Sequence, residues 1–599
     1  MEKMMGTTDG GFRLLTSVEV TVLIFSITTY LLLFLAGRAV LKRDSPIALY
    51  APVGLAVSYL FFIFFSLFFA KFSATVPFYA VVCFAAFGCL KRKKGLKFEL
   101  ALFSVSIAML LPLIYLAVIN NNPLWDDFTN WLPPARYLFE YNHLPTLDIP
   151  DVTHVTQTYP FLRAMFHAWV VKFSGTFNLN VQGVLNMLLA GSFLVWAHEL
   201  KKVQFENQNN VGEVASCLPL MGLLAASLTV WILTLNTRLV LGSFADPALS
   251  LSLAGVLIYL SSSRNIESCF WNGRIDTNLF FLFLFPYFIK DAAVYFVPML
   301  FFCFWLSKLG QSEIQSVSSV IKMARKLAIQ TVHFAPLFMV MMIWNKYCNQ
   351  NGLNFSIALQ PIDTWNFDVV PQILKSMLSQ TLGRPYLLIG LIISIFLILK
   401  NWNSNILQSK IRRTILPPIM FIIAMHGFLF IAYLGAFGES GAARATSFSR
   451  YIAPAGFLIW VALIVYWVTQ HDRMINKSFK VVCAVLFISF SGLIVAKADK
   501  FVVPDTQTPL RQAAKEIQKN YSHSKSLLIV DALSSGIDYV SIRYYLGREY
   551  YTRVDGLTWR PNSMPLPELR LLMKKYDDVF IYSAPKSLMQ SVQKIQGEK

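Results

Sequence analysis

Two adjacent carboxylates, Asp126 and Asp127, stand where an apolar run ends, between Trp125 and Trp131. Tryptophan is typical of the membrane–water interface, whereas the carboxylates need a separate explanation. One explanation is chemical, because a positioned carboxylate takes a proton from a substrate hydroxyl as a general base. The other is local, since aspartate is a favoured N-cap and a helix is expected to follow. Both interpretations stay open on these residues alone.

Charged residues interrupt two further apolar stretches. Asp246 precedes Pro247 at the start of one, and Lys290 and Asp291 divide the stretch 279–306. A charge at mid-membrane depth costs about 2.5–3.5 kcal/mol on the permissive insertion scale, so such groups usually pair or line a cavity. The structural alternatives are a helix cap at Asp246 and a short surface loop at Lys290–Asp291.

Three arginines, Arg384, Arg444 and Arg450, border the later apolar runs, and Tyr451 follows the last of them. The planar guanidinium binds two phosphate oxygens at once. We expect these arginines and Lys290 to meet the aspartates at one depth. The alternative is that each arginine only contacts lipid headgroups.

The composition identifies the surroundings of these residues. The chain has 599 residues, of which 55% are hydrophobic and 14% charged, against roughly 25% charged in soluble domains. Its net charge of +19 is gathered in short tracts between apolar runs. That pattern is typical of the positive-inside rule rather than of nucleic-acid binding. The seven cysteines have no metal-ligand spacing and predict neither a disulfide framework nor a zinc site.

A membrane-spanning helix needs about 20 largely apolar residues. This criterion predicts an all-α polytopic protein with 13–14 transmembrane helices, near 14–36, 46–70, 74–90, 98–119, 181–199, 215–235, 243–261, 275–289, 292–307, 327–344, 385–400, 415–436, 451–469 and 480–497. With Lys91–Lys94 placed in the cytoplasm, every strongly basic tract falls inside. The segments 120–180, 345–384 and the chain after about residue 498 then lie outside.

The chain is therefore divided into three regions. Residues 1–97 are N-terminal transmembrane helices, and 98–497 form a transmembrane core with the outer loop 120–180. Residues 498–599 alternate between helical and strand-like segments, with strands expected at 526–530 and 579–582. Such alternation predicts a small extracytoplasmic α/β domain.

The order of these motifs resembles the GT-C superfamily of integral membrane glycosyltransferases, and within it the relatives of protein O-mannosyltransferases and lipid A aminoarabinose transferases. The resemblance covers most of residues 98–599. It rests on the acidic outer loop at Trp125–Asp127, on Tyr159–Pro160 at the start of a surface helix, on Asp246 and Lys290–Asp291, and on Ser449–Tyr451 with Pro454. The acidic loop here follows the fourth predicted span, whereas in many members it follows the first.

The resemblance implies a glycosyltransferase that moves a sugar from a polyprenyl-phosphate carrier to an acceptor on the extracytoplasmic face. Asp126 or Asp127 is the expected catalytic base. Expected substrate-binding residues are Tyr159, Asp246, Lys290, Asp291, Arg384, Arg444, Arg450 and Tyr451. The partners are membrane lipid, the lipid-linked donor, and a glycolipid, glycan or protein acceptor. No cofactor or metal is implied, and the implied location is a bacterial inner membrane.

Two other functions fit the same chain. A lipid or polysaccharide flippase explains many spans and intramembrane charges, but inverted repeats are common in transporters and none is evident here. An O-antigen polymerase or ligase shares the carrier lipid and differs in its donor. Dependence on the outer aspartates distinguishes an enzyme from a scaffold, and substrate movement without bond formation indicates a transporter.

Overall fold

The computed structural model describes residues 14–91, 95–120, 126–151, 156–204, 214–235, 241–262, 275–308, 325, 327–353, 359–401, 405–470, 485, 488–489, 492, 507–521, 526–531, 536–551, 553–558 and 566–597. Trp125, Arg92–Lys94 and nearly all of the predicted span 480–497 lie outside these residues.

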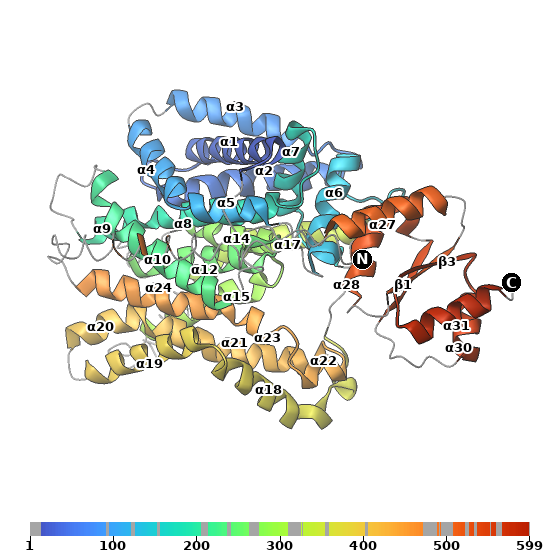
Figure 1. Cartoon of the computed structure of the whole chain (residues 1–599). Helices are drawn as coiled ribbons and strands as arrows, with labels where there is room; N and C mark the ends of the chain where they lie inside the picture. Colours follow the sequence, from blue (N-terminus) through green and yellow to red (C-terminus); the bar gives the residue numbers. More distant parts are fainter. Residues whose placement is uncertain are drawn as a thin grey trace.

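The described chain is mainly helical, and most of its long helices run in roughly one direction in stacked layers (Figure 1). The first layer holds α1 (Ser17–Val40), α2 (Tyr50–Phe68, preceded by the short helix Ile47–Leu49), α3 (Val76–Lys91), α4 (Leu96–Met109) and α5 (Leu111–Ile119). The middle layers hold α8 (Val181–Leu194), α9 (Trp196–Gln204), α10 (Leu218–Leu235), α12 (Asp246–Ser262), α14 (Thr277–Ile289), α15 (Ala293–Lys308) and α17 (Ala335–Gln350).

The last layer holds α18 (Val370–Leu382), α19 (Pro385–Lys400), α20 (Asn405–Thr414), α21 (Leu416–Gly435), α22 (Glu439–Ala443), α23 (Phe448–Tyr451) and α24 (Ala453–Gln470). One hydrophobic core extends through all layers, from Val22 in α1 to Val468 in α24. The predicted N-terminal region, residues 1–97, therefore shares its core with the rest of the helical bundle.

Six helical stretches are long and apolar enough to cross a membrane, and the number rises to eight if two bent pairs each count as one span. The bent pairs are α4 with α5, and the stretch Phe367–Leu382 with α19. Five predicted spans form apolar helices of 10–17 residues, namely those at α3, α10, α12, α14 and α15. The chain is thus a multi-pass membrane protein by length and composition, with fewer full-length spans among its described residues than predicted.

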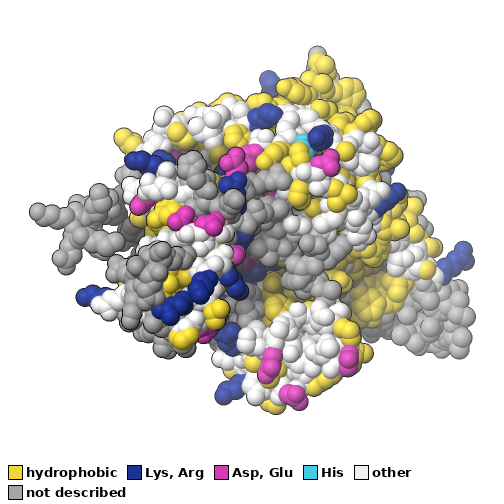
Figure 2. Space-filling view, turned by 90° about the vertical axis from the view of Figure 1, so that its right-hand side faces the viewer, with side chains coloured by type: hydrophobic (Ala, Val, Ile, Leu, Met, Phe, Trp, Pro, Cys, Tyr) yellow, Lys and Arg dark blue, Asp and Glu magenta, His cyan; other side chains and the backbone are white. Residues whose placement is uncertain are grey.

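One end of the bundle carries two basic helices, and the other end carries the C-terminal domain. Helix α9, with Lys201 and Lys202, and helix α20, with Arg412 and Arg413, lie at one end (Figure 1). Helix α6 (Leu132–Tyr141) and the C-terminal domain lie at the other, which we call the site end. Figure 2 views the site end directly: charged side chains are scattered over it, and hydrophobic side chains gather toward its upper and right-hand margins.

The first two helices pack with their backbones in contact. A Cβ added at Gly37 would lie 1.7 Å from the carbonyl oxygen of Tyr50, and one added at Gly54 would lie 2.0 Å from that of Leu33. Small residues at such crossings allow membrane helices to approach closely. Only glycine fits at either position without moving a backbone.

We expect Gly37→Ala to destabilise the protein by about 1–3 kcal/mol, because overpacking forces the two helices apart. Gly427 in α21 is the matched control, since an added Cβ there meets nothing within 4 Å. Gly427→Ala should stabilise the protein by about 0.5–1 kcal/mol through helix propensity. Unfolding in mixed micelles measures both changes; equal stability of the two variants would contradict the close crossing.

The C-terminal domain is a small α/β unit, as the sequence predicts. Its parallel sheet has the order β2-β1-β3, built from β1 (Leu527–Asp531), β2 (Val554–Thr558) and β3 (Asp578–Ser583). Around it lie α27 (Gln507–Asn520), α28 (Ile537–Leu546), α29 (Arg548–Tyr551), α30 (Leu566–Met573) and α31 (Lys586–Gly597). Strand β2 was not predicted from the sequence. Its residues, Val-Asp-Gly-Leu-Thr, include a glycine and an aspartate, which are uncommon in strands.

Candidate functional site

Two buried ion pairs meet at the first residue of α12. Lys290 Nζ lies 2.7 Å from Asp246 Oδ1, and Arg450 Nε lies 3.4 Å from Asp246 Oδ2. Arg450 also donates a hydrogen bond to Asp126, so one guanidinium links two carboxylates. Asp246 and Lys290 are each at most 4% exposed in their side chains. These four residues, which we call the charge cluster, contain two cations and two anions.

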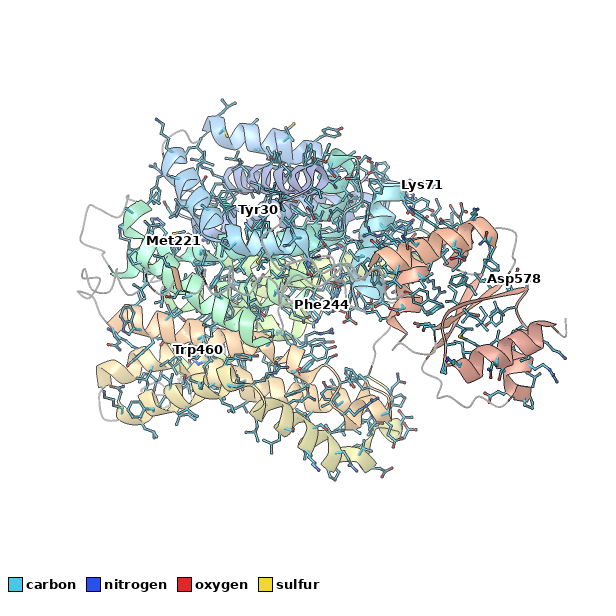
Figure 3. The ribbon with its side chains drawn as sticks, in the orientation of Figure 1. Tyr30, Lys71, Met221, Phe244, Trp460 and Asp578 are labelled. Atoms are coloured by element: carbon cyan, nitrogen blue, oxygen red, sulfur yellow. The ribbon has the colours of Figure 1, made fainter. Side chains whose placement is uncertain are left out.

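Aromatic rings surround the charge cluster. The centroid of the Tyr451 ring lies 5.0 Å from Lys290 Nζ and 5.3 Å from the Arg450 guanidinium carbon. Phe244 lies 5.3 Å from the same guanidinium carbon, and its label in Figure 3 marks the position of the cluster inside the bundle. Such cation–π contacts stabilise desolvated cations. Lys290 and Asp246 are thus buried, whereas the side chain of Asp126 is 26% exposed.

A second network fixes the segment that leads into α12. Asp127 accepts a hydrogen bond from Ser243 Oγ, and Arg163 Nη1 donates to the carbonyl of Ser243 at 2.6 Å. Asn186 binds Arg163 through its Oδ1 at 3.2 Å, while its Nδ2 donates to the carbonyls of Gly242 and Phe244 at 3.1 Å. Arg163 and Asn186 therefore hold the backbone from which Asp246 projects.

Neither Arg163 nor Asn186 was among the predicted site residues. The signal for Arg163 was a cation in α7 (Leu162–Ser174), a helix otherwise rich in apolar and aromatic residues. A cation at such a place usually has a paired or functional role. Asn186 in α8 offered no comparable signal, because its partners are backbone carbonyls distant in sequence.

We expect Asn186→Ala to destabilise the protein, since each buried polar group left without a partner costs about 1–3 kcal/mol. Asn401→Ala, at the C-terminal end of α19, should change stability by less than about 0.5 kcal/mol. Thermal unfolding in detergent compares the two. A combined Asn186→Ala and Arg163→Met variant should lose less than the sum of the single losses; full additivity would contradict a shared network.

Asp126 and Asp127 lie on an unusual backbone. Residues Asp127–Trp131 form a π-helical turn that continues into α6. The side chain of Asp126, the residue before this turn, makes no capping hydrogen bond and pairs with Arg450, while Asp127 binds Ser243. The capping interpretation is therefore wrong for Asp126. Single π turns occur frequently at functional sites.

The C-terminal domain packs directly on this turn. The Phe128 and Tyr544 rings lie 5.2 Å apart, and Arg136 in α6 donates to the carbonyl of Tyr544 in α28. Phe128, Leu132 and Tyr544 form a small hydrophobic cluster. The domain thus supports the element that carries both aspartates.

A cavity of about 380 Å³ opens beside the charge cluster. Its inner end is polar and includes Lys290, Asp291, Tyr159 and Tyr451. Its walls are apolar side chains of α15, α17 and α21, among them Phe296, Met341 and Phe428. Two wall residues, Tyr295 and Ile431, are 57% and 48% exposed. The cavity therefore joins the buried charges to exposed apolar side chains.

Asp291 is the carboxylate that lines this cavity. It lies in the turn between α14 and α15, and the backbone amide of Ala292 donates to it at 2.7 Å. Burial raises the pKa of Asp291, and neighbouring Lys290 only partly opposes that effect. Lys290 and Asp291 lie in a short loop, as one of the two interpretations of the sequence predicted. The loop is not a simple surface loop, because Lys290 is buried and ion-paired.

The predicted site residues fall into two groups. Contacts or a common cavity join Asp126, Asp246, Lys290, Asp291, Arg450, Tyr451 and Tyr159, with Asp127 adjacent. Arg444 is exposed, and its Nε donates to the carbonyl of Ser440. Arg384 stands at the N-terminus of α19. The ion pairs that build the cluster involve Lys290 and Arg450 rather than these two arginines.

Within the described residues, no group of three or more His, Cys, Asp or Glu side chains has the arrangement of a metal site. Asp246 and Asp126 are paired with Lys290 and Arg450. No known protein family, curated protein or solved structure matches the chain. Its function has to be argued from the site itself.

Proposed function

We propose that this protein is a membrane glycosyltransferase whose donor is a sugar linked to a polyprenyl phosphate. The observation that carries the proposal is the cavity. Lys290 and Asp291 line its polar end, Arg450 lies beside Tyr451 in the lining, and the apolar walls include the exposed side chains of Tyr295 and Ile431. An amphiphile with an anionic head and a long hydrocarbon chain is complementary to both ends. The cavity volume is also within the roughly 300–1,000 Å³ typical of ligand pockets.

Lys290 and Arg450 are suited to the phosphate of such a donor. Both are desolvated and held by Asp246, so their charges are fixed before a ligand arrives. Preorganised cations stabilise the negative charge that a phosphate gains as it leaves. Tyr451, in contact with both cations, and Tyr159 offer aromatic faces for the sugar.

Asp126 is the proposed base. Its side chain is 26% exposed, whereas Asp127 is buried and bound by Ser243. In the structure Arg450 binds Asp126. A donor phosphate competes for the guanidinium and so releases the carboxylate. Asp126 then takes the acceptor proton while the acceptor oxygen bonds to the anomeric carbon. The bond from that carbon to the phosphate oxygen breaks, and its electron pair stays on the lipid phosphate.

The proposed orientation places the site end outside the cytoplasm. Lys201–Lys202 and Arg412–Arg413 lie at the opposite end of the bundle, and basic tracts favour the cytoplasmic side. A bacterial inner membrane with the site facing the periplasm is the location proposed on this basis and on the resemblance to GT-C enzymes.

The binding experiment uses a short-chain polyprenyl monophosphate with the purified protein in nanodiscs. Ala432→Trp in α21 places a large ring in the cavity wall and should weaken binding at least tenfold. Ile423→Trp in the same helix is the matched control, because Ile423 is 67% exposed and lies outside the cavity lining. If both variants bind as the wild type does, the cavity is not the donor site.

The raised pKa of Asp291 predicts a pH dependence of phosphate binding. Below that pKa Asp291 is neutral, and above it a negative charge faces the ligand phosphate. Affinity should therefore fall as pH rises through the raised pKa of Asp291. Asp291→Asn should remove this component, leaving only the titration of the phosphate itself. Titrations of wild type and variant from pH 5 to 8 measure it; parallel curves would contradict the assignment.

A further inference from the structure

Helix α18 has three distinct faces. Ile373 and Met377 are buried against the bundle. The next face is apolar and exposed: Leu374, Leu378 and Leu382 are 51%, 59% and 57% exposed. The third is polar and exposed, and carries Gln372, Lys375 and Ser379. An exposed surface divided lengthwise into an apolar and a polar half is typical of a helix lying at a membrane surface.

The connection to α19 fixes the direction of α18. The stretch Phe367–Leu382 and α19 meet at an angle of 80°, across a break at Gly383–Arg384. Helix α19 is apolar apart from the buried Ser394 and the terminal Lys400, and Ile392, Phe396 and Leu399 are each at least 60% exposed. A helix of this kind contacts lipid along its length. If α19 crosses the bilayer, α18 lies close to the membrane plane.

We infer that α18 is embedded in the lipid leaflet at the site end, with Leu374, Leu378 and Leu382 inserted among the acyl chains. Three observations support a phospholipid leaflet as the partner. The exposed apolar row of α18 leads into α19, which is itself apolar and exposed. The 80° bend sets α18 across the direction of α19, and Lys375 and Arg384 lie beside the row. Cations at this level reach the headgroup phosphates while their stems stay in apolar surroundings.

Side chains on the inner face of α18 bind the segment that leads to Arg450 of the charge cluster. Ser376 Oγ donates to the carbonyl of Ala443 at 2.7 Å, and Gln380 Nε2 donates to the carbonyls of Arg444 and Ala445 at 3.1 and 3.0 Å. The amide of Ser449 donates to Gln380 Oε1 at 3.2 Å. The helix therefore holds the turn that immediately precedes Arg450.

That turn is strained. Ala445 and Ser447 have φ angles of 45° and 63°, in the left-handed region that side chains other than glycine rarely adopt. Strained backbone persists where surrounding contacts hold it, and it clusters at functional sites. With α18 anchored in the leaflet, its hydrogen bonds tie the position of Arg450 to the membrane surface.

The test is a nitroxide scan of the full chain in nanodiscs, in a background in which the seven native cysteines are replaced by alanine. Labels at Leu374→Cys and Leu378→Cys should be accessible to oxygen, which concentrates in the bilayer, and shielded from a water-soluble nickel chelate. Labels at Lys375→Cys and Ser379→Cys should show the reverse order, and Ile392→Cys in α19 calibrates full burial in lipid.

Equal nickel accessibility of the apolar and polar rows would overturn the inference, because the helix would then be in water. Shielding of the Leu374 and Leu378 labels from both reagents would also overturn it, since a protein partner would then cover the row. Labelling of the wild-type chain with a carbene reagent dissolved in the lipid tests the same contact. Mass spectrometry should find it on Leu374 and Leu378 as on α19; its absence from α18 would refute leaflet insertion. Neither measurement requires glycosyl transfer, so the inference stands or fails independently of the proposed function.

Discussion

Lys290→Met should destabilise the protein by about 3–5 kcal/mol, the usual cost of removing one partner from a buried ion pair. The charge cluster has two cations and two anions, and this change leaves Arg450 alone between Asp246 and Asp126. Methionine preserves most of the side-chain volume, so the loss reports the charge rather than a cavity. Unfolding in mixed micelles, followed by circular dichroism, measures the change.

Lys202→Met is the matched control. Lys202 pairs with Glu199 at 3.0 Å, but its side chain is 42% exposed, and such pairs contribute about 0–1 kcal/mol. The double variant Lys290→Met, Asp246→Asn removes one charge of each sign and should recover part of the lost stability. If Lys290→Met costs no more than Lys202→Met, the pair with Asp246 does not hold the site together.

Asp126→Asn should lower the rate of sugar transfer by about 10²–10⁴-fold, the contribution expected of a general base. Asparagine has nearly the same shape but cannot accept the proton. Asp148→Asn, at an exposed carboxylate between α6 and α7, is the control and should retain full activity. Single-turnover transfer in proteoliposomes, at saturating donor, isolates the chemical step.

Asp127→Asn separates the two aspartates. Asp127 is 1% exposed and accepts the Ser243 hydroxyl, so its replacement should act mainly on stability. If Asp127→Asn abolishes transfer in a folded protein while Asp126→Asn does not, the base is Asp127 and the role of Asp126 is only to hold Arg450.

The meeting of Asp126, Asp246, Lys290 and Arg450 was predictable because each stands at the end of an apolar run. Helices of similar length in one bilayer bring their ends to similar depths, so charges at these ends gather at one level. The same reasoning does not distinguish these cations from Arg384 and Arg444, because depth alone does not determine which side of a helix a residue occupies. Arg444 is exposed and binds the carbonyl of Ser440, and Arg384 stands at the N-terminus of α19.

Other features needed three-dimensional information. Arg163 and Asn186 act through backbone carbonyls of residues 242–244, and no pattern in either helix indicates such partners. The π-helical turn at Asp127 and the strained turn at Ala445–Ser447 depend on tertiary contacts rather than local propensity.

The most direct measurement offers the reconstituted protein the same radiolabelled sugar in two forms, linked to a polyprenyl phosphate and linked to a nucleotide, together with membrane acceptor extracts. The account predicts transfer from the lipid-linked form only, with one polyprenyl phosphate released for each sugar transferred, and loss of both products in Asp126→Asn. Movement of the intact lipid-linked sugar across the bilayer without release of polyprenyl phosphate, or transfer from the nucleotide sugar, would contradict it.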